Sequence, residues 1–178
     1  MKRLFLIVSL LIVIAACGAI FVRVRHELTE QRDNIAMGWS QVNDAMEQRA
    51  TLSRRMAERF QAIADSPAAV VLEVTAARTA LMQRVATEGK ISANDRLSAA
   101  LSKLLLEADH QPHVNSDHEF HQMEEELRSV DDRIADSRLK YNDALARYNT
   151  RIQSFPHNLV ARLSGFGRDD AYFKTIPF

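Results

Sequence analysis

Four histidines lie close together in the stretch DHQPHVNSDHEFH, in the company of three carboxylates. These residues are His110, His113, His118 and His121, with Asp109, Asp117 and Glu119. Imidazole and carboxylate at this density are donors that zinc or nickel accepts. The spacing matches no established zinc signature such as HExxH, and histidines at a junction between loop and helix are commonly solvated. We therefore predict no metal site, and keep a metal- or ligand-sensing role for this cluster as the alternative hypothesis.

The next stretch, MEEELRSVDDRIADSR, is rich in acidic side chains with arginines between them. Its carboxylates are Glu124, Glu125, Glu126, Asp131, Asp132 and Asp136. A di-metal or acid–base site in a helical bundle needs Glu and Glu-x-x-His pairs that face the core from several helices, and the facing helices offer no such set of pairs. A solvated helix face is the simpler interpretation. No glycine-rich phosphate loop and no Ser/His/Asp set appears either. We predict no catalytic, cofactor-binding or metal-binding residues, no cofactor, and no enzymatic activity.

The overall charge and the cysteine content exclude further classes of function. Lys+Arg and Asp+Glu balance at 23 each, so the chain has no net positive field to gather a nucleic acid, and we predict no nucleic-acid partner. Cys17, the lone cysteine, rules out an intramolecular disulfide.

The amino end carries a membrane-directed segment. Residues 4–22 contain no charged side chain, and at about 1.5 Å per residue a helix of that length covers roughly 28 Å, close to the hydrocarbon thickness of a bilayer. We predict that residues 1–25 form the anchor and that the membrane is a partner through residues 4–22. Ile14 to Cys17 has the small residues that precede a lipidated cysteine, so a lipobox signal is the alternative. The apolar run continues past Cys17, which favours a retained single span.

Basic residues stand on both sides of this segment, so the positive-inside rule hardly discriminates between orientations. Lys2 and Arg3 precede the segment, and Arg23, Arg25 and Arg32 follow it. The lipobox-like cysteine favours a periplasmic or extracytoplasmic domain at the bacterial cell membrane.

The remaining chain shows helical periodicity throughout. Residues 26–64 repeat apolar side chains in steps of three and four, apart from one gap between Met46 and Met56 that Leu52 partly fills. Ser66 and Pro67 have the types expected at a helix start, with Gly89 as the stop of that second helix. Val70, Val74, Ala77, Leu81 and Val85 form its predicted apolar side.

A third helix is predicted to begin at the capping-box spacing of Ser92 and Asp95 and to end before Pro112. A fourth begins with Ser116 and Glu119 and keeps an apolar seam in steps of three and four, typical of coiled-coil or long antiparallel packing. The seam residues are Phe120, Met123, Leu127, Val130, Ile134, Ser137, Tyr141, Ala144, Tyr148 and Ile152.

The fold class predicted is all-α, an elongated up-and-down four-helix bundle at residues 26–155 with an N-terminal transmembrane helix.

The stretch KYNDALARYN repeats Tyr-Asn, with Tyr141 and Tyr148 on the seam and an asparagine after each. Buried phenols and amides need partners, so we predict that the pairs form a hydrogen-bonded layer that sets the register between helices.

Phe155-Pro156 should end the helix. Residues 156–178 are rich in aromatic side chains and are predicted to pack on the bundle; the alternative is a patch exposed to a partner or to the membrane surface.

The carboxyl third, YNDALARYNTRIQSFPHNLVARLSGFGRDDAYF, resembles the signature of the LemA family of bacterial membrane-anchored helical proteins. Trp39 and Val42 resemble its first-helix motif, and Pro112 stands where the family has a proline. The family's Pro-Asn turn after the first helix is missing here. The resemblance implies a membrane helix and a four-helix bundle, and it brings no catalytic residues. It suggests an adaptor or scaffold that binds other membrane or envelope proteins, with Trp39 and the tail aromatics as candidate contacts.

Overall fold

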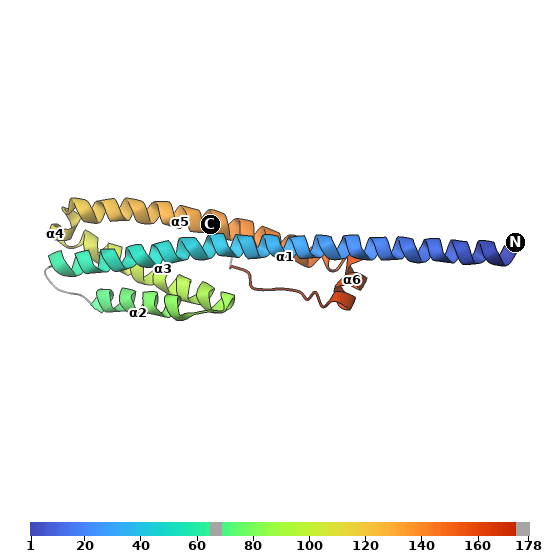
Figure 1. Cartoon of the computed structure of the whole chain (residues 1–178). Coiled ribbons are helices and arrows are strands. Elements are labelled where there is room, and N and C mark those ends of the chain that lie inside the picture. The colour runs from blue at the N-terminus through green and yellow to red at the C-terminus, as the bar shows by residue number, and fades with distance from the viewer. Residues whose placement is uncertain (65–68, 174–178) are drawn as a thin grey trace. The chain divides into compact units, whose positions relative to one another are not determined.

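Helices account for nearly all of the structure. The computed structural model describes residues 1–64 and 69–173, and these contain six helices and no strand (Figure 1). The helices are α1 (Lys2–Ile63), α2 (Ala69–Gln83), α3 (Thr87–Asp109), α4 (Pro112–Asn115), α5 (His118–Arg151) and α6 (His157–Ser164). Ser66 and Pro67, the predicted start of the second helix, lie outside the described residues.

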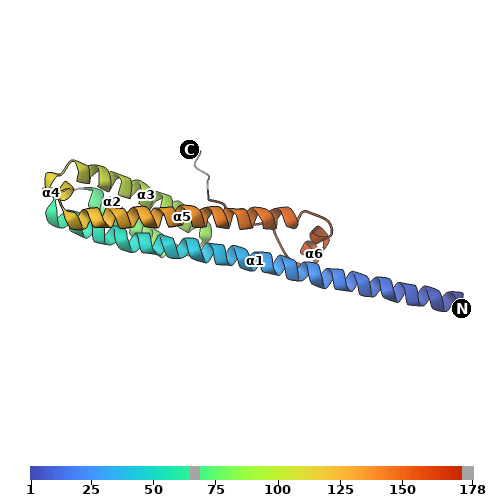
Figure 2. The ribbon, with the colours of Figure 1, turned by 90° about the horizontal axis from the view of Figure 1, so that it is seen from above.

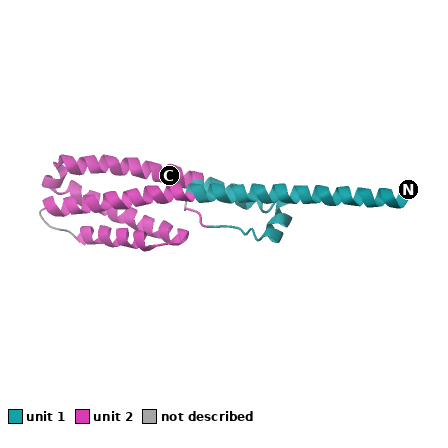
Figure 3. Cartoon of the chain, viewed as in Figure 1, with its two compact units in different colours: residues 1–38, 141–170 teal, residues 39–140, 171–178 magenta. Residues whose placement is uncertain are grey.

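The chain divides into two compact units (Figure 3). Unit 1 comprises residues 1–38 and 141–170, and unit 2 comprises residues 39–140 and 171–178. α1 and α5 each contribute to both units, while α2, α3 and α4 belong to unit 2 and α6 to unit 1.

Unit 2 is an antiparallel bundle of α1, α2, α3 and α5, which confirms the all-α bundle predicted from periodicity. Side-chain pairs between α1 and α5 set the direction: Arg59 binds Asp117, Arg55 binds Glu126 and Arg49 binds Asp131, so the α5 number falls as the α1 number rises. Lys103 of α3 reaches Glu73 of α2 at 2.6 Å. α2 and α3 lie side by side in both views (Figures 1 and 2).

The core of unit 2 follows the predicted seams. Phe60 of α1 and Phe120 of α5 are fully buried, with their ring centroids 6.4 Å apart. The other fully or nearly fully buried side chains of the two seams are Val42, Met46, Leu52, Met56, Met123, Leu127, Val130 and Ile134.

In unit 1, α1 passes close to the second half of α5. A Cβ at Gly38 would lie 3.4 Å from the Cα of Tyr141, so the absence of a side chain lets the two helices approach closely. Burial on α1 begins at Val24, directly after the apolar segment, and Leu28 is fully buried. α6 ends at Gly165, as predicted, with the glycine at φ 74° in the left-handed conformation typical of a helix C-cap.

The boundary between the second and third helices was predicted wrongly. α2 already ends at Gln83, and α3 starts at Thr87, so Gly89 lies in the first turn of α3 and does not stop a helix. Ser92 and Asp95 lie inside α3, and Val85 is 92% exposed in the connection. Glycine is tolerated in a first helical turn when the packing of the later turns supplies the stability, as Leu97 and Leu101 do here.

The start of α5 also differs from the prediction. The side chain of Asp117, and not that of Ser116, accepts the backbone N–H of Phe120 at 2.8 Å, while the Ser116 hydroxyl donates to the carbonyl of His113. Pro112 begins the short helix α4, which occupies the segment between α3 and α5. Asp117 is therefore the N-cap of α5, and its carboxylate also binds the guanidinium of Arg59, which holds it in place at the start of the helix.

We therefore predict that Asp117→Ala destabilises the full chain by about 1 kcal/mol, because one helix N-cap is lost. Ser116→Ala is the matched control and should leave the unfolding free energy within about 0.5 kcal/mol, as surface substitutions do. Urea unfolding followed by helical dichroism in detergent measures both. Equal losses in the two variants would contradict Asp117 as the cap.

Candidate functional site

The four histidines are not brought together as ligands. His110 Nδ1 lies 2.6 Å from the carbonyl of Leu106, and His118 Nε2 lies 3.0 Å from Gln122 Nε2. Each of these two rings therefore contacts a residue four positions away along the chain, and not another histidine. Within residues 1–64 and 69–173, no group of three His, Cys, Asp or Glu side chains is placed to hold a metal ion.

His121 is the best connected of the four. Its Nδ1 lies 2.7 Å from Glu124 Oε2, and its Nε2 lies 2.7 Å from the carbonyl of Asn115. Both contacts favour the protonated ring and raise its pKa, with the Glu124 carboxylate the larger cause. The imidazole thus ties α5 to α4, and both of its nitrogens are engaged within the protein.

The acidic face of α5 is used in ion pairs, both with α1 and within α5 itself. Glu126 lies 3.3 Å from Arg55, and Asp131 lies 3.1 Å from Arg49, both on α1. Asp136 pairs with Lys140 one turn further along α5 at 2.6 Å. These carboxylates therefore stand opposite guanidinium or ammonium groups and do not converge on one another.

A buried arginine that the sequence analysis missed lies at the centre of unit 2. The Arg49 side chain is 5% exposed; it donates to Asp131 at 3.1 Å, to the carbonyl of Asn94 at 3.1 Å, and to the Asn94 side-chain oxygen. Burial lowers the pKa of Arg49, and Asp131 opposes that effect. We call Arg49, Asn94 and Asp131 the arginine layer.

A signal for the arginine layer was present in the sequence. The apolar periodicity of residues 26–64 breaks between Met46 and Met56, and Arg49 and Ser53 occupy the missing seam positions, three and seven residues after Met46. Both residues are buried. A polar interruption at seam positions is the pattern that sets register in helical bundles.

The second Tyr-Asn pair, Tyr148 and Asn149, has partners other than those predicted. The Tyr148 hydroxyl donates to the carbonyl of Gly167 at 2.8 Å, and burial raises the pKa of this phenol. The Asn149 amide donates to the carbonyl of Asp169, whose own N–H donates back to Asn149 at 3.1 Å. At this pair the predicted polar layer between helices is wrong, because the side chains bind the main chain of residues 167–169. We call this set of contacts the carboxyl-terminal anchor.

The aromatic side chains after Ser154 have different environments. Phe173 is 2% exposed in unit 2, stacked on Trp39 at 6.2 Å between ring centroids and covered by the Arg138 guanidinium 4.4 Å from its own centroid. In unit 1, Arg32 lies 5.7 Å from the Phe166 ring centroid, whereas Phe155 is 78% exposed.

A charged groove runs between α1 and α5 on the surface of unit 2. Two contacts cross it, Arg55 to Glu126 at 3.3 Å and Arg133 to Gln48 at 2.5 Å, and the buried Leu52 and Val130 also contribute to its lining. The full lining is Asp44, Glu47, Gln48, Thr51, Leu52, Arg55, Glu126, Val130 and Arg133. The mixture of both charge signs over apolar groups suits recognition of a polar peptide or helix surface and holds no arrangement of reacting groups.

An ionic cluster in unit 1 joins α1 to the carboxyl end of α5 and to α6. Glu27 accepts from Arg151 Nε at 2.6 Å, and its second oxygen lies 3.1 Å from His157 Nε2. The contact with His157, followed by that with Arg151, holds the pKa of Glu27 below its ordinary value.

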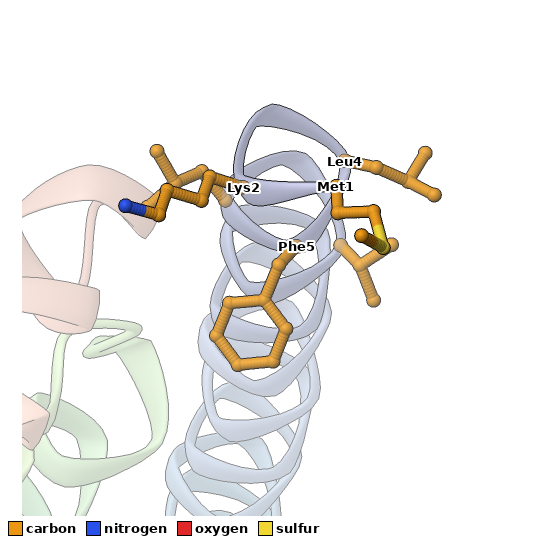
Figure 4. A pocket seen from close by; sticks show the side chains of 6 residues that line it. Met1, Lys2, Leu4 and Phe5 are labelled. Atoms are coloured by element: carbon orange, nitrogen blue, oxygen red, sulfur yellow. The ribbon is translucent and has the colours of Figure 1, made fainter.

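The amino-terminal segment of α1 is long and apolar enough to cross a membrane, and its side chains are not buried by the protein. A shallow concavity near its end is lined by Met1, Lys2, Leu4, Phe5, Leu6 and Val8. Figure 4 shows the side chains of Lys2, Leu4 and Phe5 projecting outward from this one helix. Side chains that project from one isolated helix form an open surface, and not the enclosed cavity typical of a small-molecule site.

The fold and these contacts define a membrane-associated helical-bundle protein. The sequence model of the LemA family matches residues 38–177, and the chain belongs to the LemA family. The predicted resemblance is thereby confirmed, despite the missing Pro-Asn turn.

Among curated proteins, the chain is 32% identical over 87 residues to magnetosome protein MamQ 2 of Paramagnetospirillum magneticum. It is 31% identical over 87 residues to magnetosome protein MamQ of Magnetospirillum gryphiswaldense. In each case the alignment covers 49% of this chain and 32% of the relative, so the match spans about a third of these relatives' length.

For the carboxyl-terminal anchor, we predict that Asn149→Ala accelerates hydrogen exchange of the Asp169 amide, because that N–H loses its acceptor. Tyr148→Phe should destabilise the chain by about 1 kcal/mol through loss of one buried hydrogen bond. Tyr148→Phe leaves Asn149, the acceptor of the Asp169 amide, in place, so this variant serves as the control for the hydrogen-exchange measurement. Unchanged exchange at Asp169 in Asn149→Ala would contradict the anchor.

The Glu27 cluster predicts a pH dependence. Because the folded-state pKa of Glu27 lies below its unfolded value, near 4.5, the cluster stabilises unit 1 above that pH, and its contribution is lost as the pH falls through the folded pKa. An NMR titration of the Glu27 carboxyl carbon should show a midpoint below 4.5 that rises in Arg151→Gln. A midpoint at or above the ordinary value in the unaltered chain would exclude these contacts in solution.

Proposed function

We propose that this protein is a non-catalytic, membrane-anchored adaptor that binds other membrane or envelope proteins through the charged groove of unit 2. The groove carries the proposal, because it is a described surface where charges of both signs, one amide and apolar groups are gathered between two helices. Such a surface complements a helix or extended segment of mixed charge on a partner.

The first helix supports a function at the membrane. α1 continues without a break from the apolar segment into unit 2, so the groove residues of α1 belong to the helix that carries the anchor. Retention at a bilayer raises the effective concentration of a binding surface toward partners in the same membrane. We propose a single span with the bundle on the periplasmic or extracytoplasmic side.

The relatives support a binding role over an enzymatic one. The matched MamQ proteins are named for the magnetosome and not for a reaction. The contact surface proposed from the sequence changes, however. Trp39 is stacked on the buried Phe173 within unit 2, so these two rings serve internal packing and the groove takes their place as the contact surface.

Site-specific photo-crosslinking in intact cells tests the proposal. Thr51 lines the groove, and Thr75 of α2 is its matched control, since both are exposed threonines whose hydroxyls donate to the carbonyl four residues earlier. A photoreactive residue at 51 should capture a discrete membrane or envelope protein that the same residue at 75 does not capture.

A charge reversal then separates binding from chance proximity. Arg133→Glu should weaken binding of the purified captured protein to the purified full chain several-fold, because it places a like charge next to Glu126 and Glu47 in the groove. Arg147→Glu, on an exposed part of α5 in unit 1, is the control. Equal capture at 51 and 75, or equal binding by the two charge reversals, would contradict the groove as the contact surface.

A further inference from the structure

α6 buries one face within unit 1 and leaves a second apolar face exposed. His157, Val160 and Ala161 are buried, whereas Leu159 and Leu163 are 50% and 77% exposed. Leu159 and Leu163 are four residues apart and therefore share one side of the helix. Phe155, 78% exposed, comes just before α6, so three large apolar side chains are presented outward along a short segment.

The position of α6 along α1 places this face near the bilayer. His157, the first residue of α6, contacts Glu27, which follows the charge-free segment 4–22 by five residues. Five helical residues correspond to about 7.5 Å, comparable to the thickness of the polar headgroup layer on one side of a bilayer. Burial on α1 already starts at Val24, so the packed part of unit 1 begins where the apolar segment ends. α6 lies beside α1 in both ribbon views (Figures 1 and 2).

The charges around α6 suit a headgroup layer. Arg23 and Arg25 on α1 and Arg162 on α6 are exposed, and α6 itself contains no carboxylate. Glu27 faces α6, but it is engaged by Arg151 and His157. Exposed leucine and phenylalanine beside arginine are the side chains that place short amphipathic segments in a membrane interface.

We propose that Phe155, Leu159 and Leu163 form a second membrane contact, in which α6 lies in the headgroup region beside the point where α1 leaves the lipid. The occupant of this face is the lipid surface, since His157 at the start of α6 contacts Glu27, only five residues after the apolar segment, and exposed arginines flank the face. The contact holds unit 1 against the bilayer independently of what the groove of unit 2 binds.

The lone cysteine makes a direct depth measurement possible. In a Cys17→Ser background, single cysteines introduced as Leu163→Cys and Asp143→Cys are labelled with a small environment-sensitive fluorophore. Asp143 is the matched control, because its side chain is 75% exposed in the α5 part of unit 1, two helical turns before Arg151. The full chain is reconstituted in vesicles of phosphatidylcholine with and without phosphatidylglycerol.

We expect spin-labelled lipids with a shallow label to quench the probe at 163 several-fold more than the probe at 143, and iodide in water to quench them in the opposite order. Adding Leu159→Ser and Phe155→Ser should reduce the lipid quenching at 163 while the helical dichroism stays unchanged, because both positions are exposed. Equal lipid quenching at 163 and 143 would overturn the proposal. Shielding of the probe at 163 from both quenchers would also overturn it, since a protein surface would then cover the face.

Discussion

The seam between α1 and α5 in unit 2 is the contact on which the rest of this bundle depends. Two long helices can each hide an apolar stripe only if the stripes meet in register along their length. The buried side chains of the seam, such as Phe60 and Phe120, contribute about 1.5–3 kcal/mol each. The ion pairs at its edges, such as Arg55 with Glu126, contribute about 0–1 kcal/mol when exposed, so they align the helices more than they stabilise them.

The arginine layer explains how one alignment is selected from several. A buried guanidinium is costly unless it is paired, and Arg49 has its partners on two different helices, Asn94 on α3 and Asp131 on α5. A shift of either helix by one turn would leave the buried guanidinium without these acceptors, which is unfavourable for a charge removed from water. An apolar side chain at position 49 would impose no such penalty. The arginine layer therefore favours one alignment of the three helices over the shifted ones.

The elements that repeat a pattern over many residues were predictable from the sequence, and those decided by single contacts were not. The α5 seam and the apolar segment of α1 follow from periodicity and length. The boundary at Gln83 and Thr87 was missed because local glycine and serine signals are weaker than the packing of Leu97 and Leu101. The partner of Asn149 was missed because a main-chain amide such as that of Asp169 has no signature in a sequence.

The carboxyl-terminal anchor has a consequence for how this segment can change during evolution. Tyr148 and Asn149 recognise the carbonyl of Gly167 and both main-chain groups of Asp169, which every residue type except proline supplies in full. The side chains of Arg168 and Asp169 are exposed and take no part in these bonds, so other side chains at 168 and 169 would leave the bonds in place and the path of the chain retained. A lineage could thereby alter the chemistry displayed by this segment without rebuilding the helix that holds it.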